Sequence, residues 1–209
     1  YEMLRSLVGS EMCIRDRCKA LANVTLPDTM ETIGTAAFKH CYGLPEIVIP
    51  DSVTTIEEEA FSGCDSLKEI IVPDSVVKMG NHVFGGCRSA TRIVFPKYLT
   101  YLPGYGVSFC NYMVEFVFPE NVKSISDYFF YGCISLKEIV IPDTVTTIDF
   151  RAFWDCTSLT RITIPASVTK IDSTAFDGCK KDKLVWVVTP GSYAETYAKK
   201  NYYHYVYAK

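Results

Sequence analysis

The chain has 209 residues, of which 48% are hydrophobic and 22% are charged, and its formal net charge is -3. This is the composition of an ordinary globular protein, so it excludes an intrinsically disordered chain. No run of about 18 apolar residues is present, which excludes a membrane-spanning helix in this sequence. A net charge so near zero gives no electrostatic reason to expect nucleic-acid binding.

A strict 23-residue repeat runs through most of the sequence. Cysteines recur at this spacing from Cys18 to Cys179 without an insertion. Columns of proline, from Pro27 to Pro165, and of aliphatic residues, from Ile33 to Ile171, keep the same period. A phenylalanine column is interrupted only at Val107. A fixed period of this length predicts a solenoid of stacked coils.

Each repeat predicts one coil with a strand and a return segment. In the repeat that begins at Leu44, the β-branched residues at 47–49 favour a short parallel strand, which Pro50 ends before an Asp-Ser turn. The return segment is expected to be irregular or briefly helical. Its inward residues are Val53, Ile56, Ala60, Phe61 and Cys64. Stacking such coils at ~4.8 Å buries a continuous core behind a parallel sheet on one face.

The repeat follows the motif C-x-x-L-x-x-I-x-I-P-x-x-V-x-x-I-x-x-x-A-F, which is almost complete at 133–153 and at 156–176. This motif resembles the BspA-type leucine-rich repeats of bacterial and some protist surface and secreted proteins, over about residues 18–201. The resemblance implies a leucine-rich-repeat solenoid at the cell surface or secreted. Asp-Ser or Asp-Thr follows the strand where the usual leucine-rich consensus has Asn or Cys, so long helices on the convex side are not expected.

Three segments are predicted along the chain. The stretch LRSLVGSEMCIRDR resembles a translated sequencing adaptor, so residues 1–17 are expected to be non-native. Residues 18–189 form the solenoid of about seven coils, and residues 190–209 form a C-terminal cap and tail. In the cap, Ser192 is expected to begin a helix with Glu195 at the third position of a capping box. The closing YYHYVYAK is expected to be a last strand or tail.

The repeat cysteines are expected to be buried, reduced thiols. Equivalent positions in parallel coils direct their Cβ atoms the same way, which disfavours disulfides between neighbours. Neither a Cys-x-x-Cys pair nor a nearby histidine supplies four convergent ligands, so no metal site is expected. The acidic column Asp51, Asp74 and Asp143 fits turn capping better than a weak cation site.

No catalytic constellation is recognisable. The histidines at 40, 82 and 204 are isolated, and neither a Ser-His-Asp pattern nor a phosphate-binding glycine loop is present. The sequence therefore predicts a protein that is not an enzyme and needs no cofactor.

Two surfaces are candidates for binding. The first is an apolar stripe at outward strand positions, for which β-propensity alone is the alternative explanation. The second is an aromatic cluster on the return segments, expected to form a platform that suits sugar rings or a protein hot spot. If the return segment is helical, Tyr128 and Tyr131 share one face. The alternative to a binding role for this cluster is sequence drift with local repacking. The apolar stripe is Val48, Ile71, Val94, Val117 and Val140, and the aromatic cluster is Tyr105, Tyr128, Tyr131, Arg151 and Trp154.

These observations favour a non-catalytic protein- or glycan-binding module, adhesin-like and exposed on or secreted from a bacterial cell. Its expected partner is a host or matrix protein or a glycan. Two alternatives stay open, an inert spacer that carries other domains and an intracellular scaffold, which reduced cysteines would suit. The sequence does not indicate the ligand or the oligomeric state.

Overall fold

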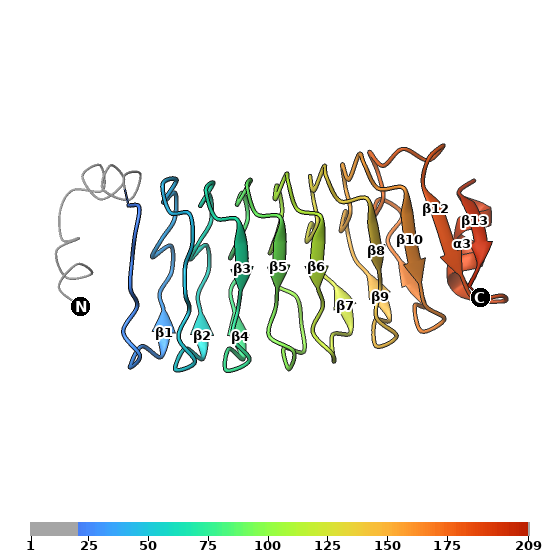
Figure 1. Ribbon diagram of the computed structural model, residues 1–209. Helices are drawn as coiled ribbons and strands as arrows, with labels where there is room; N and C mark the ends of the chain where they lie inside the picture. The colour runs from blue at the N-terminus through green and yellow to red at the C-terminus, as the bar shows by residue number, and fades with distance from the viewer. Residues whose placement is uncertain (1–20, 209) are drawn as a thin grey trace.

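The chain winds into a single elongated stack of coils that runs from β1 to β13 (Figure 1). The computed structural model describes residues 21–208. The expectations for residues 1–17 and for Cys18 therefore lie outside the described residues. The repeat solenoid predicted from the 23-residue period is confirmed.

One face of the stack carries the strands that precede the proline column, continued by two further strands at the C-terminal end. They pair in parallel, in the orders β3-β5-β6 and β13-β12-β10-β8. Glu69 lies opposite Arg92, and Arg92 opposite Glu115, so the register advances by one repeat per strand. The strands are β3 (Glu69–Ile71), β5 (Arg92–Val94), β6 (Glu115–Val117), β8 (Glu138–Val140), β10 (Arg161–Ile164), β12 (Val185–Val188) and β13 (His204–Tyr207).

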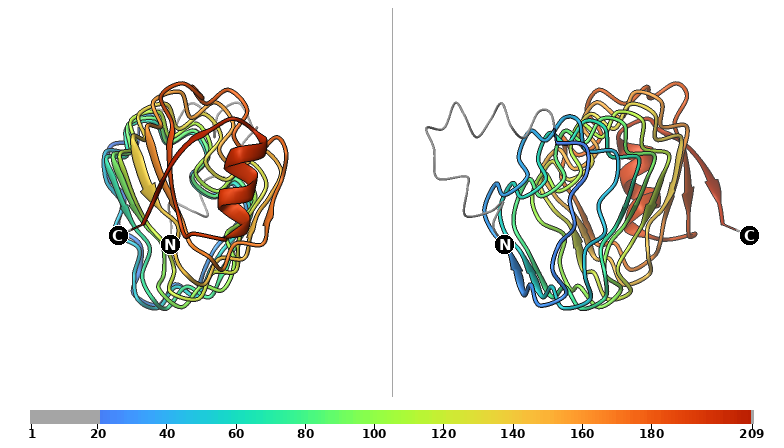
Figure 2. Two further views of the ribbon diagram at one scale, coloured as in Figure 1. Left: turned by 90° about the vertical axis from the view of Figure 1, so that its right-hand side faces the viewer. Right: turned by 60° about the vertical axis from the view of Figure 1, so that its left-hand side comes forward.

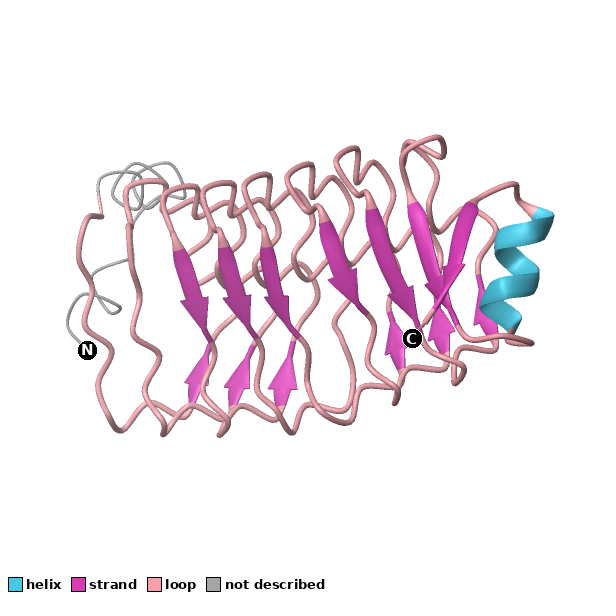
Figure 3. Cartoon of the chain, turned by 45° about the vertical axis from the view of Figure 1, so that its right-hand side comes forward, coloured by secondary structure: helices cyan, strands magenta, loops and turns pink. Residues whose placement is uncertain are grey.

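The return segments contain a second set of parallel strands, two residues each, along the aliphatic column (Figure 3). In each strand a more exposed Thr, Lys or Ser precedes a buried aliphatic residue, which is strand alternation in its shortest form. The rest of each return segment is turn, so the helical alternative was wrong for the described coils. These strands are β1 (Thr32–Ile33), β2 (Thr55–Ile56), β4 (Lys78–Met79), β7 (Ser124–Ile125), β9 (Thr147–Ile148) and β11 (Lys170–Ile171).

The core is one continuous column of inward residues. All five inward residues predicted for the Leu44 repeat are fully buried. Phe61 stacks on Phe84 with ring centroids 5.4 Å apart. Where Val107 interrupts this column, Phe95 and Phe129 fill the space edge-to-face at 5.7 Å. Substitutions at neighbouring positions thus keep the core packed.

The described repeat cysteines, from Cys41 to Cys179, are buried in this core. The Cys64 thiol donates to the carbonyl of Phe38 at 3.0 Å, and this contact recurs in the later coils. Burial raises the pKa of the Cys110 thiol to about 12. The predicted burial is confirmed, and the reduced state stays a prediction.

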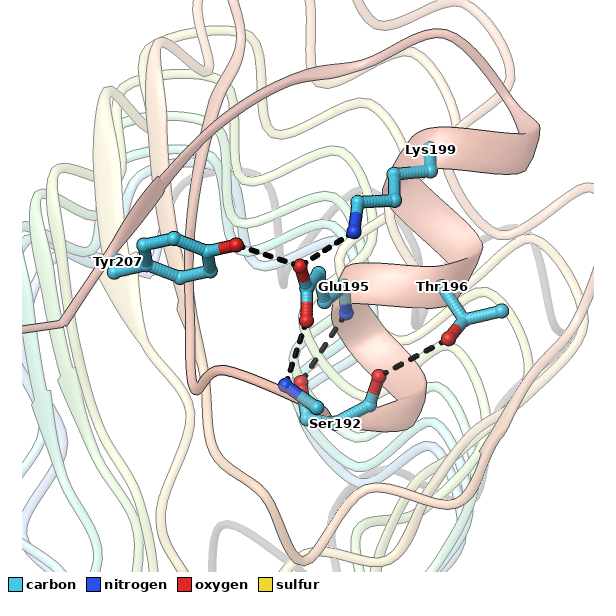
Figure 4. Close-up of polar contacts among 6 residues, drawn as sticks. Ser192, Glu195, Thr196, Lys199 and Tyr207 are labelled. Atoms are coloured by element: carbon cyan, nitrogen blue, oxygen red, sulfur yellow. Dashed lines mark hydrogen bonds and ion pairs between the residues drawn. The ribbon is translucent and has the colours of Figure 1, made fainter.

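A helix, α3 (Tyr193–Lys200), lies across the C-terminal end of the stack (Figure 2). Its Tyr197 stacks on the fully buried Trp186 with ring centroids 5.5 Å apart. Ser192 accepts a hydrogen bond from the Glu195 N–H at 3.2 Å, so the predicted cap and helix start are confirmed (Figure 4). The Glu195 carboxylate accepts from the Gly191 N–H, one residue before the cap, at 2.6 Å. The predicted last strand is β13.

Candidate functional site

The aromatic cluster lies on turns of the return segments. The N–H of Tyr128 donates to the carbonyl of Phe150 in the next coil at 3.0 Å, and the N–H of Tyr131 donates back to Tyr128 at 3.1 Å. Tyr128 has a φ of 56°, so the loop turns through a left-handed residue and not through a helix. The rings of Tyr128 and Tyr131 nevertheless lie 5.8 Å apart. The sequence therefore identified neighbours correctly from a helical geometry that the loop does not have.

Two ring ladders make up the cluster. In the first, Tyr105 stacks on Tyr128 with centroids 4.4 Å apart and ring planes 10° from parallel. In the second, Tyr131 stacks on Trp154 at 4.7 Å and 11°. The ladders meet where Tyr128 approaches Trp154 at 6.0 Å. These spacings are close to the ~4.8 Å between parallel strands, so ring stacking follows from coil stacking.

Each ladder begins with a ring that the sequence did not assign to the cluster. His82 stacks on Tyr105 at 4.2 Å, and Phe109 lies against Tyr131 at 4.3 Å. Phe150 adds an edge contact to Tyr128 at 5.3 Å. His82 shares the repeat position of Tyr105 and Tyr128, so column comparison could have found it. Phe109 and Phe150 each lie one residue away from the repeat positions of the cluster, so column comparison does not find them.

Arg151 contributes a cation to the cluster. Its guanidinium lies 4.0 Å from the ring centroid of Trp154 and 5.0 Å from that of Phe150. Its Nη1 donates to the Tyr128 hydroxyl at 3.4 Å, and it forms no ion pair within residues 21–208. Cation–π contacts therefore hold the side chain while its charge lacks a carboxylate partner.

The middle ring of the first ladder has no open face. Tyr105 lies between His82 and Tyr128, so neighbouring rings cover both of its faces. Burial, and next the adjacent Tyr128, raises the pKa of Tyr105. The five predicted residues are all partly buried, whereas Phe109 is 44% exposed. The five residues predicted for the aromatic platform therefore lie together, and their binding role stays a prediction.

The apolar stripe lies on the strand face, as expected from strand alternation. Val48 is 80% exposed and Val140 is 67% exposed, while Val94 and Val117 are partly covered. Beside it, Arg92 bridges Glu69 at 2.7 Å and Glu115 at 3.2 Å. The stripe is thus an apolar surface flanked by a charged ladder across three coils.

In the acidic column, Asp74 contacts the next coil. Asp74 accepts a hydrogen bond from the Lys97 N–H at 2.9 Å and pairs with the Lys97 ammonium at 3.2 Å. The hydrogen bond from the Lys97 N–H lowers the pKa of Asp74. In the part of the chain that the structure describes, no group of three or more His, Cys, Asp or Glu side chains is placed to hold a metal ion.

Comparison with protein families matches the chain to the BspA-type leucine-rich repeat region, in six copies over residues 12–135 and 105–198. The chain belongs to this family. Its coils and the stacked columns described above are the structural form of that repeat. No curated protein sequence matches the chain.

Among the solved structures similar to this one are two of bacterial leucine-rich repeat proteins. A protein from T. pallidum is 27% identical with a TM-score of 0.70, over 88% of this chain and 84% of its own. One from Eubacterium ventriosum is 29% identical with a TM-score of 0.68, over 73% of this chain. The aligned part is only 41% of the Eubacterium ventriosum protein's length. Across residues 21–208, no helix has the length and apolar character needed to cross a bilayer.

Proposed function

We propose that this solenoid is a non-catalytic binding module of a surface-exposed or secreted bacterial protein, and that the aromatic cluster is its main contact surface. The observation that supports this most is Arg151, a guanidinium held over Trp154 at 4.0 Å without an ion-pair partner in the described residues. The proposed surface location rests on membership of the family. The proposed role at the surface is adhesion to a host or matrix partner.

Pre-ordered aromatic and arginine side chains suit a binding hot spot. Tyr, Trp and Arg are enriched where interfaces gain most of their energy. Here stacking on Tyr105 already fixes Tyr128, and Tyr131 and Trp154 stack on each other, so little side-chain entropy is lost when a partner binds. The apolar stripe is the second candidate surface, because Val48 and Val140 are mostly exposed.

An affinity series against a panel of matrix proteins and glycans tests the proposal. Trp154→Ala and Tyr128→Ala should each weaken binding by ~2 kcal/mol or more, about 30-fold, because each removes a ring from the cluster. Val94→Ser and Val117→Ser on the stripe should change affinity much less. Asp177→Ala is the matched control, since Asp177 has the repeat position of Trp154 outside the cluster.

Thermal melting of each variant separates lost binding from lost folding. Equal loss from the ring and stripe variants would contradict a dominant aromatic cluster. A parent protein that binds no member of the panel would contradict the binding role and favour the inert spacer. Labelling of intact and lysed cells with an antibody to the solenoid tests location, and labelling only after lysis would favour the intracellular scaffold.

A further inference from the structure

A hollow of about 480 Å³ lies beside the aromatic cluster on the return segments. Its volume falls within the ~300–1,000 Å³ typical of small-molecule sites. Small residues at two adjacent repeat positions create it. They are Ser62, Gly63, Gly85, Gly86 and Ser108. The first of these positions holds Tyr131 and Trp154 in later coils, and the second holds His40 and Phe109 in other coils.

Gly86 lines this hollow, and no side chain from the preceding coil covers it. In the same column, His40 covers Gly63, where an added Cβ would lie 2.5 Å from the imidazole Nδ1. Phe109 covers Gly132 in the same way, at 2.8 Å. A Cβ on Gly86 would meet only the backbone of Gly63, at 3.5 Å. The two glycines in succession therefore leave the space between His40 and Phe109 open to a ligand.

The first rings of both ladders line the hollow. They are His82 and Phe109. An inner ring such as Tyr105 has both faces covered, whereas an end ring keeps one face that no other ring of its ladder covers. The neighbour of Phe109 one coil earlier is Gly86, which has no side chain. No side chain at that position therefore covers the Phe109 ring, which is 44% exposed, and the apolar C–H face of a sugar can pack against it.

Polar groups lie on the rim of the same hollow. The Arg88 guanidinium is 3.6 Å from the Asp65 carboxylate, which is longer than a hydrogen bond, and the carboxylate also accepts from the Arg88 backbone N–H. Burial raises the pKa of Asp65, although Arg88 opposes this shift. A carboxylate and a guanidinium side by side can accept from and donate to adjacent hydroxyl groups, and their charges offset one another.

We propose that this hollow binds one or two pyranose units of a neutral oligosaccharide. The inference deepens the proposed binding function and rests on it. A sugar has an apolar face and hydroxyl edges. The hollow offers a ring at the end of a ladder, a base that no side chain covers, and a polar pair whose charges offset one another. The offset rim charges favour a neutral sugar over an acidic or amino sugar.

Filling the hollow provides the test. Ser62→Tyr places a ring where Tyr131 and Trp154 show that the fold accepts one, and Asp177→Tyr makes the same change at an equivalent position outside the hollow. The probes are short neutral hexose and N-acetylhexosamine oligosaccharides, measured by saturation-transfer NMR and titration calorimetry. Ser62→Tyr and Asp65→Asn should each weaken binding at least about tenfold, whereas Asp177→Tyr should leave it unchanged.

The possible failures are distinguishable. Oligosaccharide binding that survives Ser62→Tyr but is lost in Trp154→Ala would overturn the hollow and leave the aromatic cluster as the binding surface. A parent protein that binds matrix proteins but no neutral oligosaccharide would overturn the sugar assignment alone. Tighter binding to acidic than to neutral oligosaccharides would also overturn it, since Arg151 and not the hollow would then select the ligand.

Discussion

Left-handed residues recur at two positions in the return segments. One position holds glycine in four coils, which marks it in the sequence, and its other left-handed members are His40, Phe109 and Asp155; the glycines are Gly63, Gly86, Gly132 and Gly178. The other position holds no glycine and was not recognisable. Its members with positive φ are Ala36, Glu59, His82, Tyr105, Tyr128 and Arg151. A left-handed non-glycine residue costs roughly 1–2 kcal/mol, which inter-coil hydrogen bonds and ring stacking must offset.

This strain predicts an unusual effect of glycine. Ala36 has a φ of 53°, so Ala36→Gly should raise the free energy of unfolding by roughly 0.5–1 kcal/mol. Ala37→Gly, one residue along the same loop and outside the left-handed region, should lower it. Urea unfolding followed by circular dichroism measures both. If the two variants lose stability equally, the backbone at Ala36 carries no strain.

The C-terminal helix is held by a carboxylate network centred on Glu195 (Figure 4). Glu195 accepts from the Lys199 ammonium at 2.6 Å and from the Tyr207 hydroxyl at 2.8 Å. The capping residues were predictable because they are local in sequence. The role of Tyr207 was not, because it depends on where β13 pairs with β12. The helix is therefore joined to the last strand as well as capped.

This network makes the stability of the fold depend on pH in the acidic range. Hydrogen bonds from Lys199 first, and then Tyr207, lower the pKa of Glu195 from 4.5 to about 2. The stabilisation is therefore present above pH ~4.5 and is lost as pH falls toward about 2. Glu195→Gln should melt at a lower temperature than the parent at pH 7, and the difference should shrink between those two values. Glu120→Gln, an exposed site in another coil, should not show this convergence. A constant difference across the range would argue against a lowered pKa.

At the scale of the whole molecule, the period determined what could be predicted. Inward columns such as the one containing Phe61 were readable, because each coil repeats the same burial. The members of the aromatic cluster were readable for the same reason. The ring orientation, the covered faces and the hollow at Gly86 were not, because they depend on the loop backbone and on side chains that lean over the next coil. Repetition thus shows which residues meet, but not which surfaces they leave open.

The modular core and its cap should respond differently to deletion. Removing residues 134–156, one whole repeat, joins Cys133 to Thr157 in register and lets Phe130 meet Phe176. The shortened chain should stay folded, with a lower unfolding midpoint because fewer coils stack. Removing residues 190–209 instead takes away Tyr197 and Tyr203, which cover the fully buried Trp186. An uncovered apolar end should then bind a hydrophobic dye and aggregate. Size-exclusion chromatography, dye fluorescence and melting compare the two chains, and a cap-deleted chain that stays monodisperse with the parent's melting temperature would show the cap to be dispensable.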